Sequence, residues 1–325
     1  MNYRSVSDLN STILSNLHRL PRDVDVVVGV PRSGLLAASL VALALNLPLA
    51  DLDGFAAGRL LASGQTRRRR ALERGFEDLR HALVVDDSIF TGGSMEAVRA
   101  KLAALGSTKK LTHCAVYGVK KTAGRVDLVL EIVPMPRVFE WNIMHHSVLG
   151  SACVDIDGVL CLDPTSEEND DGVAYLNFLQ NAWPLHVPTQ RIGTLVTSRL
   201  EKYREQTQAW LAHHGIEYDR LVMLDLPDAE TRRKLGAHGV FKGKYYKDSH
   251  SPLFIESEEA QARLIVEISG KSVFCTATGQ MLQPGLLSPV AALKRVQHSE
   301  GLRRIARTAL SAPARARLKA VLFRH

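Results

Sequence analysis

Two neighbouring aspartates follow an apolar run and precede a turn of small residues, in HALVVDDSIFTGGS (81–94). Asp86 and Asp87 would repel a phosphate, but carboxylates suit ribose hydroxyls and can stabilise a developing cationic sugar. The turn enters a predicted helix, where outward-facing backbone amides and the hydroxyls of Thr91 and Ser94 would form an anion site. A carboxylate pair beside a phosphate cradle fits the chemistry of a pentose 5-phosphate.

The order of strand, acidic pair and Thr-Gly-Gly-Ser resembles the signature of the type I phosphoribosyltransferases. The resemblance covers about residues 20–142 and implies a domain over 1–147 that uses phosphoribosyl diphosphate (PRPP) and Mg²⁺, with Asp86 and Asp87 as catalytic residues. DVVVGVPRSG (25–34) looks like this family's first strand and diphosphate loop. The implied substrate-binding residues are Arg32, Ser33, Gly34, Ser88, Thr91, Gly92, Gly93 and Ser94.

Two further segments look like parts of the same site. SGQTRRRRALERGF resembles the mobile arm that closes over the substrate in such enzymes, where Arg67 and Arg68 would neutralise the diphosphate leaving group. A solvated charge run is the alternative for these arginines. RVFEWN (137–142) would supply part of the acceptor pocket, with Trp141 as a stacking surface. Simple packing is an equal alternative for this tryptophan.

A second aspartate pair lies in ACVDIDGVL (152–160), at the carboxyl end of a predicted buried strand. The spacing of Asp155 and Asp157 points both side chains the same way from an extended chain, and Gly158 permits a tight turn. Paired carboxylates suit a nucleophile and a general acid in phosphoryl transfer, with a divalent cation to offset their charge. A calcium-binding or turn motif is the alternative.

The Asp-x-Asp-Gly pattern resembles the first motif of the haloacid dehalogenase (HAD) superfamily, and the resemblance extends from residue 152 to about 278. It implies a phosphatase domain over 148–280, in which Thr197 and Ser198 of GTLVTS contact the transferring phosphoryl group. A lysine should follow. Lys242, Lys244 and Lys247 compete for that role, and Lys244 or Lys247 is favoured here.

The same resemblance implies an acidic last motif and a Mg²⁺ ion. Glu256 of LFIESEEAQ is the best candidate, which gives Asp155, Asp157 and Glu256 as the expected metal ligands. Only about 37 residues separate the first two motifs. That length is too short for a large cap domain, so the phosphatase site should be open enough to admit a bulky substrate.

Together the two halves predict a bifunctional ribofuranosyltransferase, which is a glycosyltransferase joined to a hydrolase. The enzyme would transfer 5-phosphoribosyl from PRPP to an acceptor, release diphosphate, and remove the 5-phosphate through an aspartyl-phosphate intermediate. Fusions of this kind resemble bacterial enzymes of polysaccharide biosynthesis, which implies a glycan or lipid-linked glycan acceptor. Two alternatives stay open: a nucleobase phosphoribosyltransferase with a nucleotide phosphatase, and a non-catalytic PRPP-sensing regulator.

Both aspartate pairs follow predicted strands, so sheets must position them. Short β-branched runs alternate with helical patterns, which predicts the α/β class, with two doubly wound parallel-sheet (Rossmann-like) domains. In the first half we expect strands at 25–30, 82–85 and 111–119, and helices at 6–20, 35–45 and 93–105. A second cycle opens at Ala152, which places the boundary near 145–151.

Composition bounds these expectations. With 325 residues, of which 46% are hydrophobic and 23% charged, the chain excludes the disordered, fibrous and membrane-spanning classes. Its net charge of +7 resides in 285–325, where nine Lys or Arg accompany one acid. Residues 281–325 therefore predict a basic amphipathic helical tail, which either contacts an anionic membrane surface or packs on the chain's own acidic body. Phe323 is its only aromatic residue, which argues against nucleic acid as a partner.

The expected location is the cytoplasm, with peripheral contact to the inner membrane face through the tail. The amino terminus has no basic segment followed by an apolar core, so no secretory signal is predicted. The four cysteines lack metal-ligand spacing, which predicts reduced, buried thiols.

Overall fold

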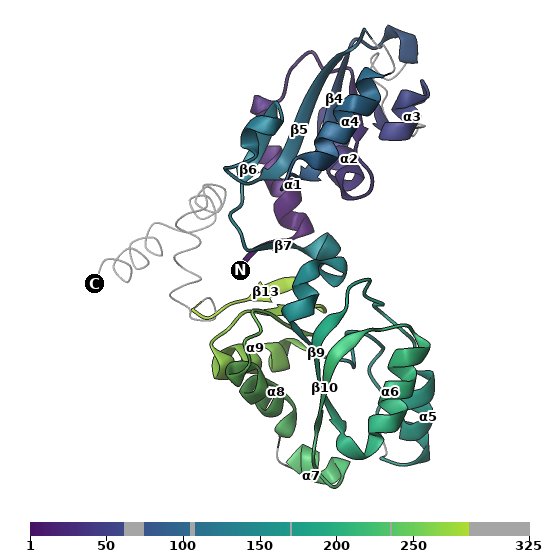
Figure 1. Ribbon diagram of the computed structural model, residues 1–325, viewed down its shortest axis with the longest axis vertical. Helices are drawn as coiled ribbons and strands as arrows, with labels where there is room; N and C mark the ends of the chain where they lie inside the picture. Colours follow the sequence, from purple (N-terminus) through teal and green to yellow (C-terminus); the bar gives the residue numbers. More distant parts are fainter. Residues whose placement is uncertain (62–74, 105–107, 170, 235, 286–325) are drawn as a thin grey trace, which may run out of the picture. The chain divides into compact units, whose positions relative to one another are not determined.

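A computed structural model of the chain describes residues 1–61, 75–104, 108–169, 171–234 and 236–285 (Figure 1). The chain divides into two compact units, Met1–Ile143 and Met144–His325. Each contains a largely parallel sheet with helices, so the predicted α/β class is confirmed. Residues 286–325 of the predicted helical tail (281–325) and the run that holds Arg67 and Arg68 lie outside the described residues, whereas Met281 and Leu282 belong to a strand.

The first unit is built on a five-stranded parallel sheet in the order β3-β2-β4-β5-β6. Its strands are β2 (Val26–Gly29), β3 (Leu49–Asp51), β4 (His81–Ser88), β5 (Lys110–Gly118) and β6 (Leu128–Ile132). A separate parallel pair joins β1 (Asn2–Arg4) to β7 (Arg137–Phe139). The central strand β4 ends at the predicted aspartate pair, and it pairs with β2 on one side and β5 on the other.

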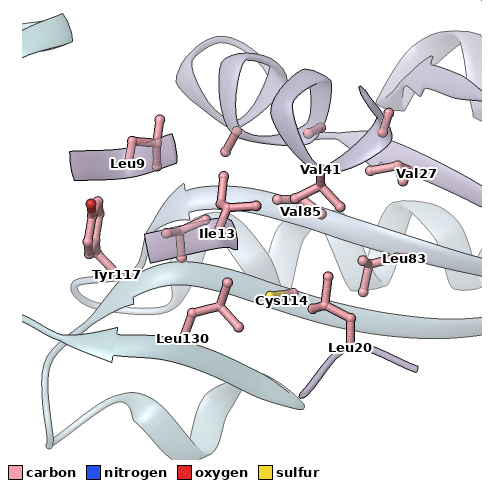
Figure 2. Close-up of a cluster of buried hydrophobic side chains, with 14 of the residues drawn as sticks. Leu9, Ile13, Leu20, Val27, Val41, Leu83, Val85, Cys114, Tyr117 and Leu130 are labelled. Carbon is pink, nitrogen blue, oxygen red and sulfur yellow. The ribbon is translucent and has the colours of Figure 1, made fainter. Parts of the chain in front are cut away.

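Helices cover both faces of this sheet. They are α1 (Val6–Ser15), α2 (Ser33–Leu45), α3 (Leu52–Ala56) and α4 (Gly93–Ala103). Val27 and Leu83 belong to a core cluster with residues of α1 and α2 (Figure 2), whereas Val28 and Val84 belong to a cluster with residues of α3 and α4. Because successive side chains of a strand point to opposite faces, strands covered on both sides must be apolar throughout. The runs DVVVGV and HALVVDD have this character.

The second unit contains a six-stranded sheet in the order β10-β9-β8-β11-β12-β13, in which only the β12–β13 pair is antiparallel. Its strands are β8 (Cys153–Val154), β9 (Ile192–Leu200), β10 (Tyr218–Leu224), β11 (Phe254–Glu256), β12 (Val273–Cys275) and β13 (Gln280–Leu282). Its helices are α5 (Val173–Asn181), α6 (Arg204–His213), α7 (Ala229–Lys234), α8 (Ala237–Asp248) and α9 (Glu259–Ser269). Figure 1 shows α5 and α6 on one face of the sheet and α8 and α9 on the other.

Several predicted details can be compared directly. The expected helix at 6–20 ends at Ser15 as an α-helix, and a short 3₁₀ turn follows over Leu17–Arg19. All four cysteines are free and buried, as expected. Among the described residues, no helix combines the length and the apolar character that crossing a bilayer requires.

Candidate functional site

The carboxyl end of β4 presents the first site. Asp86 and Asp87 close the strand, and the turn that follows reaches the first residue of α4, Gly93. Gly92 has a φ of 91°, and a Cβ atom there would lie 2.6 Å from the side chain of Arg125, so only glycine fits this turn. The predicted phosphate-binding residues Thr91, Gly93 and Ser94 are all exposed, as an anion site at a helix amino terminus requires.

The two adjacent aspartates have unlike surroundings. Asp86 is buried, and burial together with the charge of Asp87 raises the pKa of Asp86 to about 8. Asp87 accepts a hydrogen bond from the Ser33 hydroxyl at 2.7 Å through Oδ1. Its Oδ2 accepts another from the indole Nε1 of Trp141 at 2.8 Å. Asp87 is therefore fixed by hydrogen bonds to both of its carboxylate oxygens, whereas burial disfavours the ionised form of Asp86.

The predicted diphosphate loop lies directly beside these carboxylates. Ser33 begins α2 and bonds to Asp87, and the Arg32 side chain is exposed. A Cβ atom at Gly34 would lie 2.8 Å from Oδ1 of Asp86. The small size of Gly34 lets the start of α2 approach β4 closely. Ser88 is partly buried at the end of β4.

Trp141 packs on neighbouring aromatic rings and also contacts the acidic pair. Its ring stacks on Phe139 at 4.9 Å between centroids and 7° between planes, and Phe139 in turn stacks on Tyr117. The indole is thus packed against the core while its N–H reaches Asp87. Sequence reasoning missed the nearby Arg137, which is buried and donates from Nη2 to the carbonyl of Ile89 at 2.9 Å. This bond anchors the segment between Asp87 and the phosphate-binding turn.

The second site lies where β8 ends at the centre of its sheet. Asp155 and Asp157 follow β8, while Ser198 and Glu256 come from the ends of the neighbouring strands β9 and β11. All four residues line one cavity of about 330 Å³. Gly158 has a φ of 71°, and a Cβ atom there would collide with Ser257. The glycine is therefore required for the turn that brings both aspartates into the cavity.

A buried lysine links two of these carboxylates. Nζ of Lys242 lies 2.6 Å from Oδ2 of Asp155 and 2.8 Å from Oε2 of Glu256, and it donates to Oε1 of Gln261 at 3.0 Å. Lys242 is thus the lysine that the structure places in this cavity, whereas Lys244 and Lys247, which the sequence favoured, are both exposed. Of these three lysines only Lys242 is buried, because residues two and five positions further along a helix point in other directions.

Burial governs the charges of this cluster. It raises the pKa of Asp155 to about 8, with Lys242 acting in the opposite direction and Glu256 and Asp157 adding to the rise. Burial alone disfavours the ammonium, but Asp155 and Glu256 together raise the pKa of Lys242 above its ordinary value. Asp155, Asp157 and Glu256 thus line one cavity, and Lys242 contacts two of these three carboxylates, Asp155 and Glu256.

Asp157 has its own partner, which sequence reasoning missed. Nη2 of Arg199 lies 2.6 Å from Oδ1 of Asp157, and Nε donates to both carboxylate oxygens at 3.1 and 3.2 Å. Arg199 is fully buried in β9, two residues after Thr197. The available signal was a charged residue inside the otherwise uncharged strand run GTLVTSRL, since a buried arginine needs a carboxylate.

The two predicted hydroxyls of GTLVTS have different roles. Thr197 is fully buried, and its Oγ1 accepts a hydrogen bond from the amide of Arg199 at 3.2 Å. Ser198 lines the cavity instead, and its buried Oγ has no hydrogen-bond partner. Ser198 is therefore the hydroxyl available to a ligand, whereas the resemblance had placed the matching hydroxyl on Thr197.

The residues of the second site fit Mg²⁺ in part. Oδ1 of Asp155 is buried without a hydrogen-bond partner, and Glu256 lies beside it on Lys242. In the described part of the chain no three His, Cys, Asp or Glu side chains form a metal-binding group. The expected third ligand, Asp157, is held by Arg199. Because Mg²⁺ keeps several waters and needs only one or two carboxylates, Asp155 and Glu256 suit it, and the ion would offset phosphoryl charge there.

Comparison with known proteins identifies the first unit. Residues 3–142 match the family described as the phosphoribosyl transferase domain. Over 98 residues the chain is 26% identical to the transcriptional regulator GfcR of Methanococcoides burtonii, a stretch that is 30% of this chain and 46% of that protein. The chain thus spans about half the length of this curated relative.

Solved structures of phosphoribosyltransferases resemble part of this chain. The Helicobacter pylori xanthine-guanine-hypoxanthine enzyme is 18% identical, with a TM-score of 0.32, over 44% of this chain and 92% of that one. The purine enzyme of Pyrococcus horikoshii is 20% identical, also with a TM-score of 0.32, over 43% and 92%. The orotate enzyme of Aeropyrum pernix is 22% identical, with a TM-score of 0.27, over 39% and 71%. At these scores the likenesses carry no argument about substrate.

Proposed function

From a chain whose residues 3–142 are a phosphoribosyltransferase domain, we propose an enzyme that acts twice on one pentose. The first unit transfers 5-phosphoribosyl from PRPP to an acceptor, and the second removes the 5-phosphate. The observation that carries the second step is the buried cluster of Asp155, Lys242 and Glu256 beside Asp157.

In the first step an acceptor hydroxyl attacks C1 of the ribose and gives its proton to water, while the bond from C1 to the diphosphate oxygen breaks and diphosphate leaves. Mg²⁺ would offset the charge of the departing diphosphate. Asp86 and Asp87 face the ribose and stabilise the cationic sugar, since carboxylates favour positive charge nearby. Thr91, Ser94 and the amide of Gly93 hold the 5-phosphate at the start of α4. Arg32 faces the diphosphate.

In the second step Oδ1 of Asp155 attacks phosphorus, and the bond from phosphorus to the ribose 5-oxygen breaks. Asp157, which Arg199 holds as a carboxylate, passes a proton from water to the leaving oxygen. It then accepts a proton from the water that hydrolyses the aspartyl phosphate, so the carboxylate of Asp155 is regenerated and inorganic phosphate is released. Lys242 keeps Asp155 oriented by the 2.6 Å contact.

The pairing of these steps points to the product. Removing the 5-phosphate would defeat nucleotide salvage, because that phosphate defines the nucleotide. A plain ribofuranosyl group is the sensible end product, and a growing polysaccharide, free or lipid-linked, is the proposed acceptor. The basic tail (281–325) offers a peripheral membrane contact for a lipid-linked acceptor.

Mass spectrometry of candidate glycan acceptors incubated with PRPP and Mg²⁺ tests this proposal. The wild type should add a ribosyl group, while Asp155→Asn should release diphosphate and accumulate a 5-phosphoribosylated acceptor. The matched control is Asp219→Asn, an exposed aspartate at the opposite end of β9 and β10 that should behave as wild type. Ribosylation of free nucleobases would instead favour the nucleobase alternative. If no acceptor led to release of diphosphate, the proposal would be wrong.

One observation favours a second candidate, a PRPP-responsive regulator. A match of 98 residues relates this chain to a protein named as a transcriptional regulator. Such a protein would bind PRPP without releasing diphosphate, and would bind DNA in a PRPP-dependent way. Calorimetry with PRPP, paired with a diphosphate-release assay, separates the two candidates.

A further inference from the structure

A buried arginine of α7, Arg232, lines the cavity of the second unit. Its terminal nitrogens donate to neutral acceptors, Nη1 to the carbonyl of Ser198 at 3.0 Å and Nη2 to Oδ1 of Asn169 at 3.1 Å. Its Nε is buried and has no hydrogen-bond partner. A buried guanidinium that meets only neutral acceptors lacks the negative charge that normally stabilises it.

The other two buried cations near this cavity are already matched. Arg199 is paired with Asp157, and Lys242 is paired with both Asp155 and Glu256. Among the described residues that line the cavity, Arg232 is thus the cation whose charge no carboxylate balances. Its position suits an anion that is supplied from outside the protein.

Three buried atoms without hydrogen-bond partners belong to this one cavity. They are Oδ1 of Asp155, Oγ of Ser198 and Nε of Arg232. Buried polar atoms are nearly always paired, so unpaired ones gathered in one cavity indicate a ligand that completes them. One nucleophilic oxygen with two donors matches a tetrahedral phosphoryl group.

We propose that Arg232, with Ser198, binds the non-bridging oxygens of the phosphoryl group that Asp155 attacks. The inference rests on the proposed phosphatase step and deepens it, because it makes a dianionic phosphomonoester the substrate class of this cavity. Arginine suits the role since it stays charged at every relevant pH and offers fixed donors to phosphate. Its bond to the Ser198 carbonyl also holds the serine beside the anion.

Beryllofluoride is the probe, because in the presence of Mg²⁺ it bonds to a nucleophilic carboxylate and imitates the phosphoryl group. The readout is the rise in the thermal unfolding midpoint of the full chain as beryllofluoride is added. The variants are Arg232→Gln, Arg232→Lys and Asp155→Asn. The matched control is Lys234→Gln, because Lys234 lies on the same helix, 73% exposed and paired with Glu230.

We expect beryllofluoride to raise the midpoint of the wild type and of Lys234→Gln equally, and to leave Asp155→Asn unchanged. Arg232→Gln should need about 10- to 100-fold more beryllofluoride for half of the shift, as befits a lost hydrogen bond to a charged group. Arg232→Lys, which keeps the charge, should fall in between.

Three outcomes would overturn the inference. They are a wild type that does not respond, a shift that survives Asp155→Asn, and an Arg232→Gln variant with the wild-type beryllofluoride requirement, even if its ligand-free midpoint falls. The last pattern would make Arg232 a purely structural residue. If the expected pattern appears but no phosphate is released from any phosphomonoester, the anion site stands and the proposed phosphatase fails.

Discussion

Trp141 donates its indole N–H to Oδ2 of Asp87 at 2.8 Å, across 54 residues of sequence. Ser33 holds the other oxygen of Asp87 at 2.7 Å. The segment after β7 and the start of α2 therefore fix one carboxylate of the pair from two directions. A carboxylate that must face a short-lived cationic sugar benefits from such fixed donors, because it need not reorganise during the reaction.

Trp141→Phe should slow phosphoribosyl transfer. Phenylalanine preserves stacking on Phe139 but removes the only donor of the indole ring, which leaves Oδ2 of Asp87 without this partner. A hydrogen bond to a charged group contributes about 1.5–3 kcal/mol, so kcat/KM for PRPP should fall by roughly tenfold or more. Diphosphate release measures this. Trp183→Phe, at a 72% exposed tryptophan of the second unit, is the control, and equal rates in both variants would remove Trp141 from the mechanism.

Asp86→Asn should stabilise the protein without ligand, and more so at alkaline pH. The pKa of Asp86 is raised from its ordinary 3.8 to about 8 in the folded state. Between these values the unfolded chain releases a proton that the folded chain retains, so the stability of the wild type falls as pH rises through this window. Asparagine does not ionise and escapes the loss. The gain in free energy of unfolding should therefore grow by about 4 kcal/mol from pH 5 to pH 8.

Denaturant unfolding of both proteins at the two pH values measures this gain. Asp53→Asn serves as the control, because Asp53 is 71% exposed. This variant should change the free energy of unfolding by the same small amount at pH 5 and at pH 8. A gain for Asp86→Asn that does not depend on pH would mean that Asp86 is ionised in the folded state at pH 5. The same variant should stop phosphoribosyl transfer. The reaction needs the Asp86 carboxylate, although burying that carboxylate lowers the stability of the protein without ligand.

The sequence predicted the aspartates of both sites better than it predicted the side chains that contact them. The strands that deliver Asp86 and Asp155 could be found because buried parallel strands are continuous apolar runs. The lysine that contacts Asp155 could not be identified from the sequence, because the three lysines on one helix differ only in the direction in which their side chains point. Lys242 is the inward one because α8 packs against α9 and β9, and the sequence does not fix that rotation.

The sequence also did not predict that several arginines would be buried. Arg137, Arg199 and Arg232 are each at most 5% exposed, and each reaches part of a site that lies far away in sequence. Composition assigns arginine to the surface, so only the tertiary fold reveals these contacts. Their common role follows from chemistry: a fixed, permanently charged fork can hold a carboxylate, a carbonyl or an external anion in place.

Arg199→Gln should strongly destabilise the second unit, although its partner Asp157 is 20% exposed. Removing one member of a buried ion pair leaves the other charge uncompensated, which costs about 3–5 kcal/mol. Arg191→Gln is the matched control, since Arg191 immediately precedes β9 and contacts Asp219 and Glu217 while 57% exposed. Exposed pairs contribute only about 0–1 kcal/mol, so this variant should unfold almost as the wild type does.

Thermal and denaturant unfolding of the two variants tests this contrast, and the double variant Arg199→Gln/Asp157→Asn sharpens it. Replacing both members removes the stranded charge, so the double variant should recover part of the stability that Arg199→Gln loses. It should not recover phosphate release, because Asp157 passes the proton to the leaving oxygen in the proposed second step. A double variant no more stable than Arg199→Gln would show that the arginine stabilises the fold through its contacts with Thr207 and the ring of Phe178 instead.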